Sequence, residues 1–213
     1  MREVRLSIFE RLRTRPGELS AKALRQRAVI QMLAEKTNPQ DRTRTGLAKS
    51  LAAATGSKWQ TVYPAVFGDM EKIMVPLGII WEEGRLPLRR GPRMMQERGS
   101  PYYSLTQEGM VVALAIRGVQ GWDDIVGRIE EMGPHGGTLR SLAKSSPGMV
   151  QYIMERYVEA WCRSGSSLLP LDLGRIRNDE PLSMCRDLLD AYGGMEDAAR
   201  EGVAALLSDV AGP

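Results

Sequence analysis

The sequence predicts a mainly α-helical protein with one small β-hairpin. Apolar residues recur at steps of four, four, three and four, which places them on one stripe of a helix of about five turns: Val62, Val66, Met70, Ile73 and Leu77. Gly78 stands where a left-handed C-cap would end that helix, and the β-type run 79–81 follows at once. An alanine-rich segment over 45–55 predicts a short helix before it, separated by a tight turn. Two helices running into a hairpin are the order of a winged helix-turn-helix domain.

Pro64 decides where the long helix is expected to begin. Ser57 and Gln60 have the spacing of a capping box, which would start the helix at Ser57. Pro64 would then lie in the helix interior, at a cost on the order of 3 kcal/mol. A proline in the first turn has no intrahelical hydrogen bond to lose. We therefore expect the helix to begin near Thr61, with residues 57–60 in a turn or a separate short segment.

The segments before this helix pair are predicted to be an arm, a helix and a loop. Residues 2–15 are amphipathic and contain five arginines, so they form either a short helix or an ordered arm. The first core helix runs from its N-cap Ser20 to about Glu35. Residues 37–44 are polar, with turn residues at their start, and are expected to form a loop.

A hairpin and a series of helices are predicted after the long helix. Strands over 79–83 and 101–105 flank a basic tip over 84–99 that is broken by proline and glycine. Thr106 caps the next helix, which ends near Gly118. The remaining helices are expected over 122–132, 138–145, 147–163, 181–192 and 196–210.

Charge divides the chain into a basic half and an acidic half. Residues 1–118 hold 20 Lys and Arg against 11 Asp and Glu, a net charge of +9, and residues 119–213 hold 9 against 15, a net charge of −6. Such asymmetry is typical of a polyanion-binding module joined to a module with another role, although a basic face is often merely solvated. We therefore predict a DNA-binding domain with an N-terminal arm over 1–118 and a helical dimerisation or effector domain over 119–213.

Several classes of protein do not fit the composition. No run approaches 18 apolar residues, and the charged N-terminus does not suit a signal peptide, so we expect a cytoplasmic protein. Cys162 and Cys185 lack metal-site spacing and are expected to be buried free thiols, and no metal or cofactor is predicted. The chain has one histidine and its adjacent acidic pairs diverge on a helix, so we do not expect an enzyme.

Two motifs in fixed order resemble a known family. The segment GSKWQTVYPAVFGDMEKIMVPLGIIWEEG, followed by YYSLTQEGMVVAL, is similar to the phenolic-acid-repressor (PadR) family of winged-helix transcriptional regulators. The resemblance covers about residues 28–118 and implies that a proline is tolerated at Pro64. The chain departs from the family at Thr45 to Leu47, where the second helix opens, and in its long basic hairpin tip and its N-terminal arm. Its C-terminal half contains no recognised motif.

The resemblance implies that the start of the long helix lies in a major groove of DNA. Lys58, Gln60, Thr61 and Tyr63 are the side chains there that lie off the core stripe. Gln60 suits an adenine edge, whereas Lys58 and Tyr63 suit phosphates. Tyr63 and Trp59 equally suit hydrophobic packing between helix and hairpin.

Arginines before and after the helix pair are further candidates for phosphate contacts. Two lie before the second helix and four in the hairpin: Arg42, Arg44, Arg85, Arg89, Arg90 and Arg93. The hairpin arginines suit the backbone or a minor groove, and simple solvation is the alternative for all six.

The predicted function is that of a homodimeric, sequence-specific regulator of transcription that binds double-stranded DNA. Trp122, Tyr157 and Trp161 are the candidates for dimerisation or for binding a small-molecule effector. Two alternatives stay open. The domain is a protein-interaction module that reads no DNA, or it is an architectural DNA binder without sequence preference.

Overall fold

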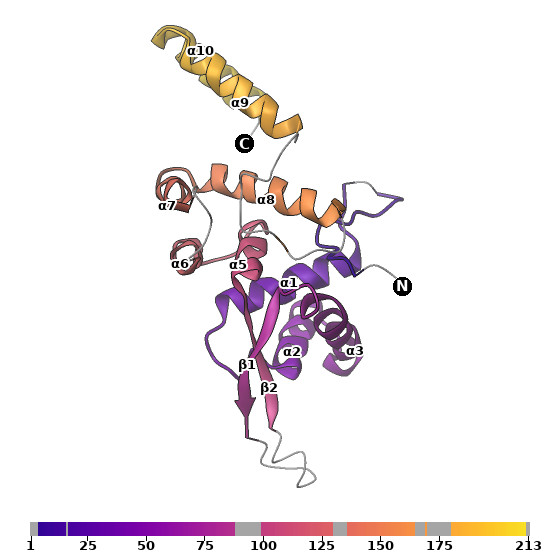
Figure 1. Ribbon diagram of the computed structural model, residues 1–213. Helices are drawn as coiled ribbons and strands as arrows, with labels where there is room; N and C mark the ends of the chain where they lie inside the picture. The colour runs from indigo at the N-terminus through magenta and orange to yellow at the C-terminus, as the bar shows by residue number, and fades with distance from the viewer. Residues whose placement is uncertain are drawn as a thin grey trace. The chain divides into compact units, whose positions relative to one another are not determined.

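The computed structural model describes residues 4–15, 17–87, 99–129, 136–164, 169 and 180–211. The chain separates into two compact units, Met1–Ile176 and Arg177–Pro213. The first contains the predicted helix pair and hairpin, and the second contains two helices (Figure 1). The expected mainly helical fold with a two-stranded antiparallel hairpin is confirmed.

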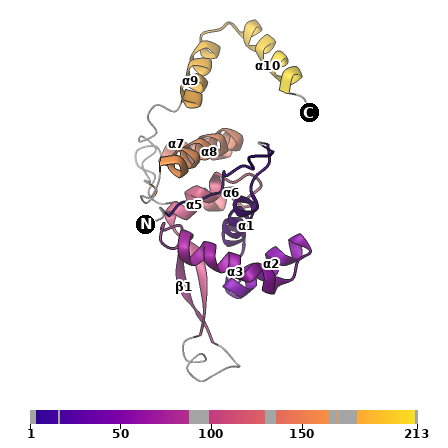
Figure 2. The same ribbon diagram turned by 90° about the vertical axis from the view of Figure 1, so that its right-hand side faces the viewer.

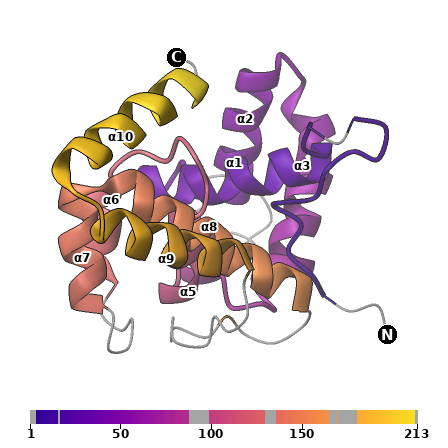
Figure 3. The same cartoon turned by 90° about the horizontal axis from the view of Figure 1, so that it is seen from above.

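Two capped helices open the first unit. Helix α1 (Ala21–Glu35) begins at Ser20, whose hydroxyl accepts a hydrogen bond of 3.1 Å from the Ala23 N–H, as predicted. Helix α2 (Arg44–Thr55) is capped in the same way by Thr43 and ends at Gly56, which has φ 64°. Figures 2 and 3 show α2 and α3 on one side of α1 and α5 and α8 on the other.

Helix α3 (Trp59–Asp69) begins two residues before the expected start at Thr61. Its N-cap is Lys58, which makes no side-chain capping bond, so the Ser57–Gln60 capping box does not form. Pro64 lies in the second turn and leaves only the Gln60 carbonyl without its helical partner. Because Gln60 is exposed, water can replace that bond, which explains why the helix tolerates the proline.

The expected single helix of five turns is interrupted by a π-helical turn, η1 (Met70–Met74). The Val75 N–H donates to the Met70 carbonyl at 2.9 Å, a bond that spans five residues. The extra residue moves the buried stripe, so Met74 is fully buried and Ile73 only partly. The stripe returns at buried Leu77, and Gly78, with φ 66°, ends the segment as predicted.

The hairpin is longer than expected. Strand β1 (Ile80–Leu86) pairs antiparallel with β2 (Ser100–Leu105), with Ile80 opposite Leu105 and Leu86 opposite Ser100. The register shifts between Glu82 and Gly84. A further bridge joins Thr43 to Tyr102, so the residue before α2 is tied to the hairpin.

The junction after the hairpin is closely packed. Thr106 caps α5 (Gln107–Leu114) by accepting from the Gly109 N–H at 3.0 Å, as predicted, and the Thr106 N–H donates to the Ile79 carbonyl at 3.1 Å. A Cβ atom on Gly109 would lie 2.0 Å from that carbonyl oxygen, so no larger residue fits. Helix α5 ends at Leu114, four residues before the expected end.

Further helices complete both units. The first unit continues with α6 (Trp122–Arg128), α7 (Gly136–Ser145) and α8 (Pro147–Ser164). The second unit contains α9 (Glu180–Gly193) and α10 (Asp197–Ala211). None of the helices in the described ranges is long and apolar enough to cross a membrane.

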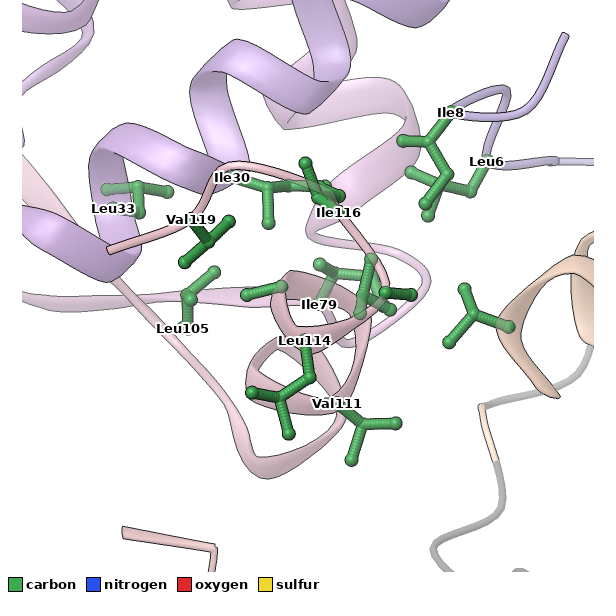
Figure 4. Close-up of a cluster of buried hydrophobic side chains, with 14 of the residues drawn as sticks. Leu6, Ile8, Ile30, Leu33, Ile79, Leu105, Val111, Leu114, Ile116 and Val119 are labelled. Carbon is green, nitrogen blue, oxygen red and sulfur yellow. The ribbon is translucent and has the colours of Figure 1, made fainter. Parts of the chain in front are cut away.

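One hydrophobic core runs through the first unit. Its side chains come from the N-terminal arm, α1, the hairpin and α5 (Figure 4), and it continues into α8 through Val150, Met154 and Val158. Residues on both sides of the predicted boundary at 118/119 share this core, for example Ile116 and Val119. The separation in the structure falls instead at 176/177. The separate roles assigned to 1–118 and 119–213 stay a prediction.

Candidate nucleic-acid interface

The start of α3 carries a small group of exposed polar side chains. Lys58, Gln60 and Thr61 are exposed, whereas Val66 and Asp69, further along the helix, are buried. The sequence prediction that these three residues lie off the core stripe therefore holds. All three lie at the N-terminal end of the helix, where the free backbone N–H groups favour anions.

Tyr63, the fourth predicted residue of this group, belongs to a row of aromatic rings. Its ring lies 6.1 Å from the Trp59 ring in an edge-on arrangement and 6.3 Å from the Phe67 ring in a stacked one. A cation lies over each end, with Lys49 Nζ at 5.9 Å from the Trp59 centroid and the Arg44 guanidinium at 4.8 Å from that of Phe67. This row joins α3 to α2, whereas the packing alternative placed Trp59 and Tyr63 between the helix and the hairpin.

Arg44 is engaged within the chain. Its guanidinium pairs with Glu71 and donates to the Tyr103 hydroxyl, while that hydroxyl donates to Glu71 Oε1 at 3.0 Å. Burial, followed by the hydrogen bond to Glu71, raises the pKa of Tyr103 to about 12. Within the chain, the charge of Arg44 joins α2, the π-helical turn after α3 and the hairpin, and its assignment as a phosphate contact stays a prediction.

Arg42 is held even more completely. It is 9% exposed, pairs with Glu83 of β1, lies 3.4 Å from the Ser104 hydroxyl and covers the Tyr102 ring at 5.2 Å. The guanidinium is thus largely covered within the chain, and the assignment of Arg42 as a phosphate contact stays a prediction. Sequence reasoning missed the partners Glu71, Glu83 and Tyr103. In the sequence, the only indication of these partners was that each element facing the arginines contains an acidic residue, Glu71 or Glu83.

The hairpin arginines are only partly described. Arg85 is about half exposed and pairs with Glu82 at 2.5 Å on the same strand. Arg89, Arg90 and Arg93 lie outside the described residues. Their assignment as DNA contacts stays a prediction.

The aromatic residues nominated for dimerisation or effector binding face the chain's own core. Tyr157 and Trp161 are 4% and 6% exposed, and Trp122 is partly buried against the same cluster. Tyr157 and Trp161 lie on α8, which packs against α5 and α7, and Trp122 lies on α6, which also packs against α5 and α7. Their assignment to dimerisation or effector binding therefore stays a prediction. The large exposed apolar residues in this half include Leu189 and Tyr192 of α9.

No metal or reactive thiol emerges from the described residues. No group of three or more His, Cys, Asp or Glu side chains lies close enough within them to hold a metal ion. Both cysteines are free, as expected, but only Cys162 is buried and Cys185 is intermediate. Burial raises the pKa of the Cys162 thiol to about 12, which keeps it protonated and weakly nucleophilic.

Comparison with known proteins found no matching family model, no matching curated protein and no matching solved structure. The resemblance to the phenolic-acid-repressor family therefore stays a prediction from the residues.

Proposed function

We propose that the segment from α1 to α5 is a winged helix-turn-helix domain that binds double-stranded DNA with sequence specificity, and that the chain regulates transcription as a homodimer. The exposed group Lys58, Gln60 and Thr61 carries the proposal. The rest of α3 is held by the core on one side and by the aromatic row on the other. The only part of α3 that offers a set of side-chain donors and acceptors is its first turn, the part of a recognition helix that meets base edges.

Each of the three side chains has a distinct role in the proposal. Gln60 suits an adenine, to which it can both donate and accept in the major groove, at about 1–3 kcal/mol of discrimination against another base. Lys58 binds a phosphate as a point charge, and Thr61 donates its hydroxyl to a base or phosphate. The positive end of the α3 dipole adds to the attraction for the DNA backbone.

The hairpin forms the second part of the proposed interface. Arg85, with Arg89, Arg90 and Arg93, supplies cations for the backbone or a flanking minor groove. Arg42 and Arg44 act indirectly, because their ion pairs with Glu83 and Glu71 fix the hairpin against α2 and α3. The net charge of +9 over residues 1–118 supports a polyanionic partner.

Dimerisation would place two such helices about 34 Å apart, in successive major grooves of a pseudo-palindromic site. Exposed Leu189 and Tyr192 lie three residues apart on α9, so they share one helix face. We propose that this face contributes to self-association. It replaces Tyr157 and Trp161, which are buried.

Selection from a random duplex pool tests the proposed function. The full-length chain should enrich a dyad-symmetric site, and Gln60→Ala should relax the preference at one base of each half-site. Gln40→Ala, which removes an exposed glutamine from the loop before α2, is the matched control and should leave the site unchanged. Binding at low salt without enrichment would indicate an architectural binder. No binding at all would favour the protein-interaction module.

A further inference from the structure

The N-terminal arm caps the end of α8. Arg5 Nε donates to the Cys162 carbonyl at 2.5 Å, and Arg5 also donates to the Arg163 carbonyl. These carbonyls belong to the last turn of α8 and have no partner within the helix. A cation at this end also interacts favourably with the helix dipole. Figures 1 and 3 show the arm passing this end of α8.

The same arm is fixed firmly to α1. Leu6 and Ile8 are 2% and 0% exposed in the core. Arg27 of α1 donates to the Ile8 carbonyl at 2.7 Å, and its guanidinium lies over the Phe9 ring at 5.2 Å. The residues that directly follow Arg5 are therefore held in place by the core and by α1. A displacement of Arg5 would act on these contacts of Leu6, Ile8 and Phe9.

A buried polar relay leads from these anchors to α3. The Ser7 N–H donates to Gln26 Oε1 at 2.8 Å, and Gln26 Nε2 donates to Asp69 Oδ1 at 3.1 Å. Gln26 and Asp69 are 0% and 4% exposed, so an unmade bond would leave a polar group buried without a partner. The Gln26 amide can take only one orientation. If it were flipped, its NH2 group would face the Ser7 N–H, which is also a donor, and its oxygen would face the Asp69 carboxylate, which is also an acceptor.

Asp69 carries a carboxylate that is buried inside a continuous helical segment. It is the last residue of α3 and directly precedes the π-helical turn. Arg25 compensates the charge by donating from Nε to Asp69 Oδ2 at 2.6 Å. A buried ion pair such as Arg25–Asp69 is weak evidence that the pair stabilises the fold. Its better-supported role is to fix the geometry of the groups around it. π-Helical turns are also frequent at functional sites.

We propose that the arm is a strap that sets the position of the C-terminal end of α3 relative to α8, with Gln26 and Asp69 as positioning residues. The inference rests on the proposed function only in naming α3 a recognition helix. Its consequence is that a change at the end of α8, such as binding of an effector or partner nearby, is transmitted through Arg5, Ser7 and Gln26 to the helix proposed to read DNA.

Hydrogen exchange of the full-length chain tests the strap without DNA. Arg5→Ala should accelerate exchange about tenfold in the last turn of α8, because a charged hydrogen bond is removed, and several-fold over residues 69–75. Arg13→Ala removes an exposed arginine from the same arm and is the matched control. Acceleration confined to the arm and α8 in Arg5→Ala would overturn the proposal.

The reverse experiment separates a strap from a merely stabilising contact. Coupling is reciprocal, so Asp69→Asn should accelerate exchange in the last turn of α8. Glu71→Gln, two residues further on but paired with Arg44, should affect α2 and the hairpin and leave α8 unchanged. An unchanged α8 in Asp69→Asn would also overturn the proposal.

Two further measurements keep the outcomes distinct. If Arg5→Ala does not fold, Arg5→Lys keeps the charge but loses the two-pronged geometry, and it should give the same pattern at smaller amplitude. Duplex selection with the same variants is scored separately. A strap seen by exchange in a chain that enriches no duplex would refute the proposed function and retain the strap.

Discussion

The hydroxyl of Tyr103 donates a hydrogen bond of 3.0 Å to Glu71 Oε1, joining the middle of β2 to the π-helical turn that follows α3. The ring is 2% exposed, and the Arg44 guanidinium lies 5.3 Å from its centroid. These contacts tie the hairpin to the π-helical turn at the end of α3.

Removing this hydroxyl should destabilise the first unit. We expect Tyr103→Phe to lower the free energy of unfolding by about 1–2 kcal/mol, because Glu71 loses a donor and Arg44 an acceptor. Urea unfolding at neutral pH measures the change. Tyr192→Phe, in the second unit and exposed, is the control and should have no effect. An equal loss in the two variants would contradict the assigned role.

The same tyrosine predicts a loss of stability at alkaline pH. Its pKa is raised from 10.0 to about 12, so between these values the unfolded chain has released the proton and the folded chain has not. The unfolded state then binds fewer protons, and the free energy of unfolding falls as pH rises from 10 to 12. Tyr103→Phe should remove this part of the decline. Parallel curves for the wild type and the variant over this range would refute the prediction.

Arg42 should matter for stability more than for direct contact with DNA. Arg42→Ala is expected to cost about 1–2 kcal/mol, because it removes the hydrogen bonds of a buried guanidinium and uncovers the Tyr102 ring. Arg85→Ala removes an arginine from the exposed side of the hairpin and should cost less than about 0.5 kcal/mol. Thermal unfolding of the two variants compares them directly. A loss of DNA affinity in Arg42→Ala without a loss of stability would contradict this prediction and support Arg42 as a phosphate contact.

Gly109 should tolerate no side chain. Gly109→Ala brings Cβ against the Ile79 carbonyl oxygen, where the ideal separation is 2.0 Å, and should cost about 3 kcal/mol or more. Gly127→Ala, in α6 with no heavy atom within 4 Å of the added Cβ, should be neutral or stabilising by up to about 1 kcal/mol. Chemical denaturation of both variants is the measurement. Similar midpoints would show that the junction of β1 and α5 can move apart at little cost.

The hairpin arginines should contribute a non-specific share of DNA affinity. We expect the combined change of Arg89, Arg90 and Arg93 to alanine to weaken binding to all sequences. The slope of log K against log salt should fall by about 0.9 for each phosphate that is no longer neutralised. Arg186→Ala, an exposed arginine of α9, is the control. An unchanged slope would exclude the hairpin tip from the DNA-binding surface.

The α9 face should govern self-association. Leu189→Ser combined with Tyr192→Ser is expected to shift the chain from dimer to monomer in size-exclusion chromatography with light scattering, because both side chains are exposed and apolar. Met149→Ser, an exposed apolar position at the start of α8, is the control. A monomeric wild-type chain would contradict the proposed dimer.

The sequence by itself determined the elements that depend on local chemistry. Ser20 and Thr106 cap their helices as predicted, and Gly78 takes the left-handed conformation that ends the helical segment. The exposed positions at the start of α3 were also predictable, because helical periodicity separates them from the core stripe. Each of these features depends on residues a few positions apart.

Tertiary structure decided what depends on distant residues. Arg42 pairs with a residue 41 positions away and Arg44 with one 27 away, so spacing could not distinguish a clamp from a phosphate contact. The same holds for Tyr157 and Trp161, whose burial depends on which helices pack against α8. The π-helical turn escaped prediction because both Ile73 and Met74 fit an apolar stripe. Packing against the core decides that Met74 is the side chain that is buried. The π-helical turn contains one more residue than an α-helical turn, and this extra residue changes which side chain faces inward.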